Sequence, residues 1–356
     1  MEIGIIGLPQ SGKTTLFRAL SGGQKSISTF ASGRLEVHSA LTDVPDERVD
    51  ALERLFLPLK KTYAKVTYAD IAGLEEGISQ KGLPGPFINL LGQMDAFIHV
   101  VRAFENPSVP FSGGTLHPAR DLSVLDMEFL LHDLGAVERR QERVVEGLKK
   151  GAQDKEQGLR EKELLARVKT GLEDERSLRD LILAPEEVKL LRGYGLLSLK
   201  PVLVVLNTGD DGQTPDLEYP HRKSALIRLP GRLESEISEL PAEDKTLFME
   251  EYGLKELFRN RVIRLSYDLL GLLSFFTVGE DEVRAWTIRQ GATAVEAAGA
   301  IHTDLAKGFI RAEVIPFQEL IELGGLNQAK NKGKLRLEGK DYVVKDGEVV
   351  HIRHNM

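Results

Sequence analysis

A glycine-rich stretch near the N-terminus constrains the fold more than any other feature of this sequence. Residues Gly7 to Thr14 match the pattern G-x-x-x-x-G-K-[ST] at every fixed position. An apolar run precedes them at residues 2–6, and a segment with helical spacing follows. The backbone amides of such a loop converge on phosphate oxygens at the start of the helix. The stretch therefore predicts a strand, a phosphate-binding loop and a helix.

The residue types of this loop predict separate roles. Lys13 would bridge the outer phosphates and act in catalysis, and Thr14 would offer its hydroxyl to Mg²⁺. Gly12 would let the backbone approach the phosphates without a side chain in the way. A glycine-rich turn without a ligand is the alternative, which the agreement of strand, pattern and helix disfavours. The predicted phosphate-binding residues are Gly7, Gln10, Ser11, Gly12, Lys13, Thr14, Thr15 and, from the next motif, Gly73.

Further apolar runs predict the rest of the sheet. They cover residues 64–73, 96–104 and 201–212, and the last is too continuous for a half-exposed strand. Strands of this kind, separated by helical segments, indicate a parallel α/β sheet.

Two of these strands end in motifs that would complete a nucleotide site. Asp70 and Gly73 form a D-x-x-G arrangement, in which Asp70 would hold Mg²⁺ through water and the Gly73 amide would sense the γ-phosphate. Asn207, Thr208 and Asp210 follow the later strand, where G proteins carry N-K-x-D and the aspartate reads guanine. Taken alone, the second motif is better explained as a structural turn, because Asn, Gly and Asp are common turn residues.

Composition excludes several other functions. The chain has 356 residues, a formal net charge of -7 and no cysteine, which removes disulfides, thiolate catalysis and cysteine-ligated zinc. It has no apolar run near the roughly 20 residues of a membrane span and no secretory signal pattern. We therefore expect a cytoplasmic protein that does not enter membranes. The acidic balance argues against wrapping of nucleic acid by the whole chain.

Changes of texture along the chain predict three domains. Residues 1–120 and 198–274 would form the nucleotide-binding domain. Residues 121–197, rich in Leu, Glu, Arg and Lys, would form an inserted helical hairpin resembling a short coiled coil, with a turn near residues 151–154. Two solvated surface helices without a partner are an equal alternative. Residues 275–356 carry short strands, tight turns and one helical segment, and predict a small α+β domain.

Taken together, the motifs resemble those of the Obg-like ATPase family, in particular its YchF subfamily of P-loop proteins. The resemblance spans nearly the whole chain and includes "GLPQSGKTTLFRAL", "DIAGL", "HVVRAFEN" and the long C-terminal segment "FFTVGEDEVRAWTIRQGATAVEAAGAIHTDLAKGFIRAEVI". It implies a P-loop G-domain fold, an inserted coiled coil and a C-terminal β-grasp module of the TGS type. It also implies binding of ATP or GTP with Mg²⁺, contact with the ribosome or its RNA, and a monomer.

The sequence departs from the family pattern at the base and at the switches. The family's N-x-x-E motif, which goes with ATP, here ends in Asp210, so both ATP and GTP remain candidates. Gly231 lies in the segment that corresponds to the family's second base-binding loop. Arg34 falls where a threonine would ligate Mg²⁺, and it would either merely replace that ligand or act as an arginine finger. Leu74 follows D-x-x-G where fast GTPases place a water-orienting glutamine.

These observations predict a slow ATPase or GTPase that acts as a translation-associated switch. The alternative from another class is an adaptor that holds nucleotide, hardly hydrolyses it, and docks a protein or RNA through the hairpin and the C-terminal module. A small-molecule kinase is disfavoured because it needs neither D-x-x-G nor this C-terminal segment.

Overall fold

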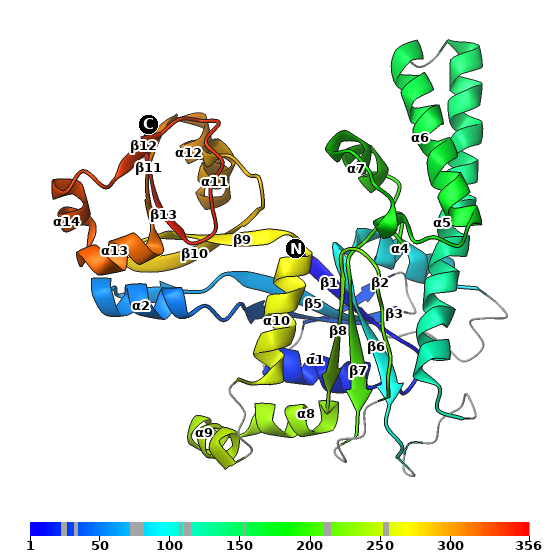
Figure 1. Ribbon diagram of the computed structural model, residues 1–356, viewed down its shortest axis with the longest axis horizontal. Coiled ribbons are helices and arrows are strands. Elements are labelled where there is room, and N and C mark those ends of the chain that lie inside the picture. Colours follow the sequence, from blue (N-terminus) through cyan, green and yellow to red (C-terminus); the bar gives the residue numbers. More distant parts are fainter. Residues whose placement is uncertain are drawn as a thin grey trace. The chain divides into compact units, whose positions relative to one another are not determined.

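The structure of the chain is a computed structural model, in which the chain divides into two compact units. It describes residues 1–22, 27–31, 35–71, 82–106, 109, 115–151, 154–209, 215–251 and 256–355. The first unit comprises Met1–Ala40 and Thr67–Arg259, and the second comprises Leu41–Val66 and Asn260–Met356. Each unit has its own sheet (Figure 1).

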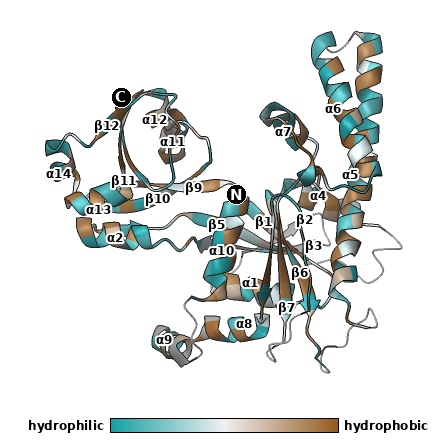
Figure 2. Cartoon of the chain, viewed as in Figure 1, coloured by the Kyte–Doolittle hydropathy of each residue, from teal (hydrophilic) through white to brown (hydrophobic). Residues whose placement is uncertain are grey.

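The first unit is built on a seven-stranded sheet with the order β2-β3-β5-β1-β6-β7-β8. Neighbouring strands from β5 to β8 run parallel, and β2 pairs with β3 antiparallel. Both β6 and β7 are buried along their whole length, as expected for strands covered on both faces. Figure 2 shows these strands as predominantly hydrophobic. The strands are β1 (Glu2–Ile6), β2 (Ile27–Ala31), β3 (Leu35–Asp43), β5 (Lys65–Ile71), β6 (Ala96–Ala103), β7 (Val202–Thr208) and β8 (Ser224–Leu229).

This parallel sheet confirms the predicted α/β fold class, and the four strands predicted for it coincide with β1, β5, β6 and β7. The β2–β3 pair and β8 were not predicted. The first unit also contains the helices α1 (Lys13–Ser21), α4 (Gly85–Gln93), α8 (Gly231–Glu239) and α9 (Ala242–Glu251). Helix α10 (Phe258–Leu269) begins in this unit and belongs to the second unit from Asn260 onward.

A long helical hairpin is inserted between β6 and β7. It consists of α5 (Pro118–Lys150) and α6 (Lys155–Glu173), followed by the short helix η1 (Leu178–Asp180) and α7 (Pro185–Arg192). Leu130, Val137 and Val144 are buried at heptad spacing along α5 and pack with the apolar face of α6. Gly151 ends α5 in a left-handed conformation with a φ of 66°, close to the predicted turn. The insertion is thus an antiparallel coiled-coil-like pair (Figure 1).

The second unit contains a six-stranded sheet with the order β12-β11-β13-β9-β10-β4. Its strands are β4 (Lys60–Thr62), β9 (Leu272–Thr277), β10 (Glu282–Arg289), β11 (Phe309–Pro316), β12 (Arg336–Glu338) and β13 (Glu348–His354). Its helices are α2 (Glu47–Phe56), α11 (Ala294–Ile301), α12 (Thr303–Lys307), α13 (Phe317–Leu323) and α14 (Leu326–Asn331). One apolar core lies between this sheet and α11.

The residues that make up this unit differ from the residue range predicted for the C-terminal domain. Residues 41–66 were assigned to the nucleotide-binding domain, yet they cluster with the C-terminal residues, and the C-terminal part of this unit begins at Asn260 rather than at residue 275. The physical reason is pairing: β4 forms a parallel edge with β10, and α2 packs against β10 and α13. Neither contact leaves a local signal in the sequence.

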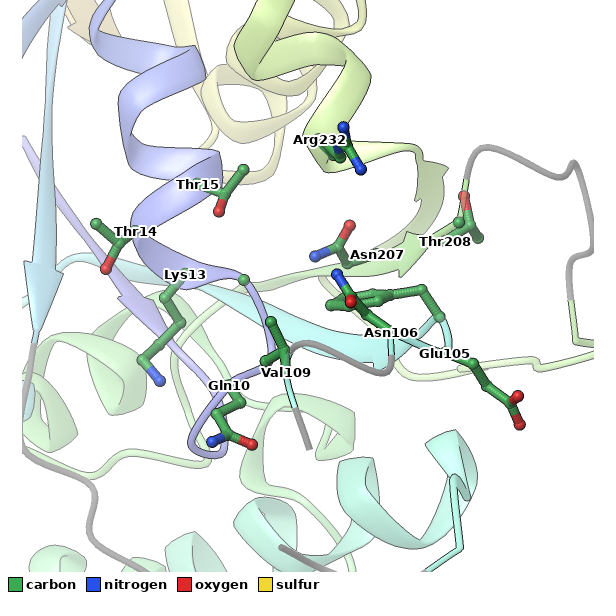
Figure 3. A pocket seen from close by; sticks show the side chains of 13 residues that line it. Gln10, Lys13, Thr14, Thr15, Glu105, Asn106, Val109, Asn207, Thr208 and Arg232 are labelled. Atoms are coloured by element: carbon green, nitrogen blue, oxygen red, sulfur yellow. The ribbon is translucent and has the colours of Figure 1, made fainter. Parts of the chain in front are cut away.

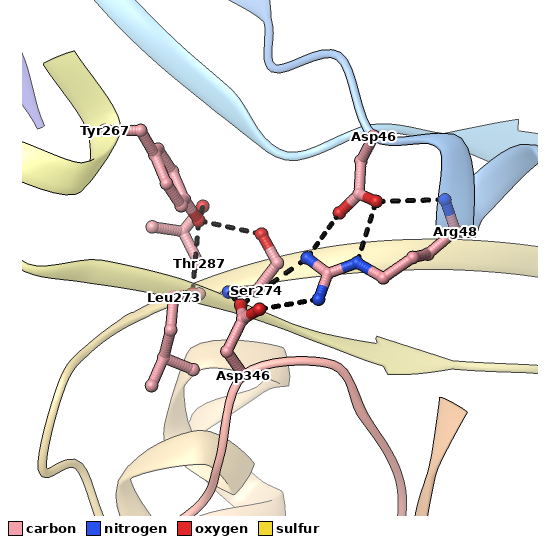
Figure 4. A network of polar contacts seen from close by, with 7 residues as sticks. All are labelled: Asp46, Arg48, Tyr267, Leu273, Ser274, Thr287 and Asp346. Atoms are coloured by element: carbon pink, nitrogen blue, oxygen red, sulfur yellow. Dashed lines mark hydrogen bonds and ion pairs between the residues drawn. The ribbon is translucent and has the colours of Figure 1, made fainter. Parts of the chain in front are cut away.

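A polar network in the second unit joins α2 to the C-terminal segment. The Arg48 guanidinium donates to both carboxylate oxygens of Asp46 at 2.8 and 2.9 Å and to Asp346 at 2.6 Å, and it stacks 5.0 Å from the centroid of the Phe276 ring. Asp346 in turn accepts from the amide of Ser274 at 2.9 Å. Figure 4 shows that Arg48 lies between the two aspartates. These contacts raise the pKa of Arg48.

Among the helices of the described residues, none combines the length and the apolar character that crossing a membrane requires.

Candidate functional site

The loop that leaves β1 leads directly into the start of α1. Gln10 has a positive φ of 60°, and Gly12, at the N-cap of α1, has a φ of 101°. No side chain caps α1, and its first turn contains no acidic residue. The first backbone N–H groups of α1 can therefore donate hydrogen bonds to a ligand, and the positive end of the helix dipole faces the loop. This arrangement suits an anion such as a phosphate group.

Lys13, the first residue of α1, is held against the loop. Its Nζ donates to the backbone carbonyls of Gly7 and Leu8, at 3.0 Å each. Burial lowers the pKa of Lys13, and the charge of Asp70 opposes that shift. An anion placed at Nζ would favour the ammonium form and so compensate for its burial.

Thr14 and Asp70 come together from α1 and β5. The Thr14 hydroxyl donates to Asp70 Oδ2 at 2.9 Å. Asp70 is buried, and its Oδ1 has no hydrogen-bond partner among the described residues. Burial raises the pKa of Asp70, against the hydrogen bond from Thr14 and the charge of Lys13. A hydroxyl beside an incompletely satisfied carboxylate is a donor set that fits Mg²⁺, which draws its remaining ligands from water and phosphate.

A larger cluster of metal ligands is not present in the described part of the chain, where no three His, Asp or Glu side chains group around a common point. Among the described residues, the donors that fit Mg²⁺ beside the start of α1 are Thr14 and Asp70.

A cavity of about 450 Å³ opens beside these residues within the first unit. Figure 3 shows Lys13, Thr14 and Thr15 together on α1, with Asn106 and Val109 across the cavity from Thr15. The cavity is lined by Gln10, Gly12, Lys13, Thr14, Thr15, Phe104, Glu105, Asn106, Val109, Asn207, Thr208, Gly209 and Arg232. The lining thus combines a lysine and helix amides with aromatic, aliphatic and amide groups.

Asn207 joins the loops around this cavity. Its Nδ2 donates to the Ser11 carbonyl at 2.9 Å, and its Oδ1 accepts from the Gly231 amide at 3.1 Å. A Cβ on Gly12 would lie 2.1 Å from Asn207 Nδ2, and one on Gly231 would lie 2.7 Å from Oδ1. Both positions therefore require glycine because the carboxamide lies so close. In this structure the Asn207 side chain therefore links the loop after β1 to the start of α8.

The predicted site residues fall into three groups. Gln10, Gly12, Lys13, Thr14, Thr15, Asn207 and Thr208 line the cavity. Gly7, Ser11, Asp70 and Gly231 are described but do not line it, and the buried Ser11 hydroxyl has no hydrogen-bond partner among the described residues. Arg34, Gly73, Leu74 and Asp210 lie outside the described residues, so their roles stay predictions.

No role was predicted for the segment after β6, which supplies Phe104, Glu105, Asn106 and Val109 to the cavity. These residues match no nucleotide motif. Their position was nevertheless a usable signal, since ligands of parallel α/β sheets bind beyond the carboxyl ends of the strands. The strand that precedes them was predicted at residues 96–104.

The fold and the site define a nucleotide-binding protein of the P-loop GTPase class. A family model described as a 50S ribosome-binding GTPase matches residues 2–122, and the model YchF-GTPase_C, described as a protein of unknown function, matches residues 272–355. The chain is 38% identical to the ribosome-binding ATPase YchF of Bacillus subtilis, with 100% of both chains covered. It is 39% identical to the protein of that name from Haemophilus influenzae, covering 100% of this chain and 99% of that one.

A comparison with solved structures points to the same family. The Schizosaccharomyces pombe YchF GTPase matches with a TM-score of 0.82 and 29% identity, over 99% of this chain and 97% of that chain. The chain belongs to the YchF family.

Proposed function

We propose that this chain binds a nucleoside triphosphate with Mg²⁺ and hydrolyses it slowly, as a switch that acts at the ribosome. The observation that carries the proposal is the cavity lined by Lys13 and the uncapped start of α1, beside the Thr14–Asp70 pair. The names of the relatives, ribosome-binding ATPase and GTPase, support both the nucleotide and the partner.

The chain's own residues have distinct roles in this proposal. Lys13 exchanges the carbonyls of Gly7 and Leu8 for phosphate oxygens, and the first amides of α1 bind the same group. Thr14 and Asp70 would hold Mg²⁺, Thr14 directly and Asp70 through water. The metal would neutralise the charge on the phosphates. Most of the catalytic effect then comes from positioning and electrostatic stabilisation.

Slow turnover is proposed from the switch residues of the sequence. Leu74 can neither accept a hydrogen bond from a water molecule nor donate one, so it cannot orient the attacking water. Arg34 cannot ligate a cation. If Arg34 only replaces the ligand, Arg34→Thr raises turnover or leaves it unchanged, as we favour. If it acts as an arginine finger, Arg34→Ala lowers kcat by orders of magnitude at nearly unchanged affinity.

For the base, we propose that ATP is accepted and that GTP also binds measurably. The chain lacks the lysine of N-K-x-D, and the Phe104 ring offers a face on which either purine can stack. The Asp210 carboxylate could accept hydrogen bonds from two donors of guanine, a pair that adenine lacks. Asp210→Ala should therefore reduce GTP affinity more than ATP affinity, as measured by calorimetry. An equal loss for both nucleotides, or no loss, removes Asp210 from the base site.

Ribosome binding by an acidic chain requires a local basic surface. Lys330, Lys332 and Lys340 are exposed in the second unit, around α14 and β12, and could contact phosphates of ribosomal RNA. Binding of this kind weakens steeply with salt. We propose a cytoplasmic monomer that co-sediments with ribosomes at low salt, and failure to co-sediment in every nucleotide state contradicts the partner.

Two measurements on the purified protein test the activity. Nucleotide released by denaturation after mild purification identifies the bound base. Multiple-turnover phosphate release at saturating ATP or GTP with Mg²⁺ should stay well below the roughly 1–10³ s⁻¹ of typical enzymes. Release above about 1 s⁻¹ without a partner overturns the slow switch. Binding with no release at all favours the adaptor, and no binding of either nucleotide overturns the proposal.

A further inference from the structure

Arg102 is a buried cation beside the cavity that the phosphate chemistry does not use. It is the next-to-last residue of β6, its exposed fraction is 3%, and it does not line the cavity. Burial lowers the pKa of its guanidinium. A buried cation is unfavourable unless its donors are well satisfied, so its contacts indicate what it does.

The guanidinium holds the segment that follows β6 at two points. Its Nε donates to the Phe104 carbonyl at 3.1 Å, and its Nη2 donates to the Val109 carbonyl at 2.7 Å. The guanidinium carbon also lies 4.5 Å from the centroid of the Phe104 ring. The Val109 amide also donates to the Asn106 carbonyl at 3.0 Å, which links Val109 to another residue of the wall.

The anchored residues form one wall of the cavity. Phe104, Asn106 and Val109 all line it, and Asn106 and Val109 lie across it from Thr15 (Figure 3). The residues that would bind phosphate come instead from the loop after β1 and the start of α1. The hydrogen bonds from Arg102 to Phe104 and Val109 therefore support the wall after β6, while the guanidinium side chain also lies beside Leu8 and Ser11 of the phosphate loop.

We propose that Arg102 is a positioning residue that holds this wall in the shape that receives the base of the nucleotide. The inference rests on the proposed function and adds to it the residue on which recognition of the base depends. An aromatic ring with an amide beside it suits a flat, partly polar ligand such as a purine. Because the planar guanidinium donates in two directions while it stacks on a ring, lysine cannot replace it.

The test distinguishes a loss of base binding from a loss of phosphate binding. The affinities of the wild type, Arg102→Met and Arg102→Lys for ATP, GTP and inorganic tripolyphosphate are measured with Mg²⁺ by calorimetry or competition. We expect Arg102→Met to weaken binding of the nucleotide about tenfold or more and to leave tripolyphosphate within about twofold. Arg102→Lys should recover little of the loss. Arg228→Met, an exposed arginine on β8, is the matched control and should bind like the wild type.

Several outcomes overturn the inference. The inference is wrong if Arg102→Met binds nucleotide with unchanged affinity. It is also wrong if this variant loses affinity equally for nucleotide and tripolyphosphate, because the substitution then disturbs the whole binding site. If Arg102→Met does not fold, Phe104→Leu provides a second test, because it removes the ring and leaves the carbonyl contacts in place. It should show the same selective loss, and wild-type affinity overturns the inference. A wild-type protein that binds no nucleotide instead contradicts the proposed function.

Discussion

Replacement of Gly12 by alanine tests the site most directly, because two separate costs can be worked out from the structure. The φ of 101° is strained for any L-residue and costs ~1–2 kcal/mol. The new Cβ would lie 2.1 Å from Asn207 Nδ2, so this side chain must move. Its displacement leaves the buried Ser11 carbonyl or Gly231 amide unpaired, at ~1–3 kcal/mol.

The sum is ~2–5 kcal/mol on the loop that must close around phosphate. If binding requires the observed loop, affinity for the nucleoside triphosphate falls by roughly thirtyfold to several thousandfold. Calorimetry measures this loss, and urea unfolding measures the part that appears as stability. Gly151→Ala is the matched control. Gly151 has a φ of 66° and open space around its Cβ position, so only backbone strain of ~1 kcal/mol is expected and nucleotide affinity should not change.

A double-mutant cycle isolates the close approach. Asn207→Ala removes the atoms that the Gly12 Cβ would meet, so Gly12→Ala should cost less in that background, with a coupling of ~1–3 kcal/mol. Costs that add to within ~0.5 kcal/mol refute the reasoning, because the two positions would then not interact.

The remaining predictions concern single side chains. Lys13→Ala should weaken binding of the triphosphate by roughly two orders of magnitude or more, and identical calorimetric titrations of variant and wild type contradict the phosphate site. Burial lowers the pKa of His99 in β6 to about 3, so the unfolded chain binds more protons below its pKa of about 6.5. Stability should therefore decline as pH falls below that value, by about 2 kcal/mol at pH 5, and His99→Leu should flatten the slope seen in urea unfolding at pH 7 and 5. Arg48→Ala should destabilise the second unit by ~1–3 kcal/mol in thermal unfolding, with little recovery in Arg48→Lys, while the exposed Arg54→Ala on the same helix stays within ~0.5 kcal/mol of the wild type.

The central strands could be predicted because burial on both faces leaves a continuous apolar run. β6 and β7 have this property throughout. The unpredicted strands lack it: β8 has partly exposed residues and includes the exposed Arg228, and β2 carries the mixed sequence "ISTFA". In the order of the described strands, β2 and β8 are the two edges of the seven-stranded sheet and β3 lies beside β2. Their sequence therefore has neither a continuous run nor a clear alternation.

The residues of the candidate site were also predictable only in part. Gly12, Lys13 and Thr14 were predictable because their chemistry fixes residue types within one short loop, and Asp70 because it ends a predicted strand. Phe104 and its neighbours were not, since a cavity wall can be built from many residue types and only the strand order brings it beside α1. Asn207 was predicted from its motif, but its hydrogen bonds to Ser11 and Gly231 join segments that are distant in sequence.

The second unit shows a limit of reading domains from texture. Its C-terminal strands and turns stand out as one segment, and the family model for residues 272–355 covers the same stretch. The sheet nevertheless takes β4 from residues 60–62, whose Thr62 pairs with Arg284. A three-residue strand is too short to show any period, and its partner is distant in the sequence. The segment that supplies β4 lies between β3 and β5, strands of the nucleotide-binding sheet. A fragment cut at the boundary of the family model therefore lacks an edge strand and α2, together with the Arg48 contacts to Asp346 and Phe276.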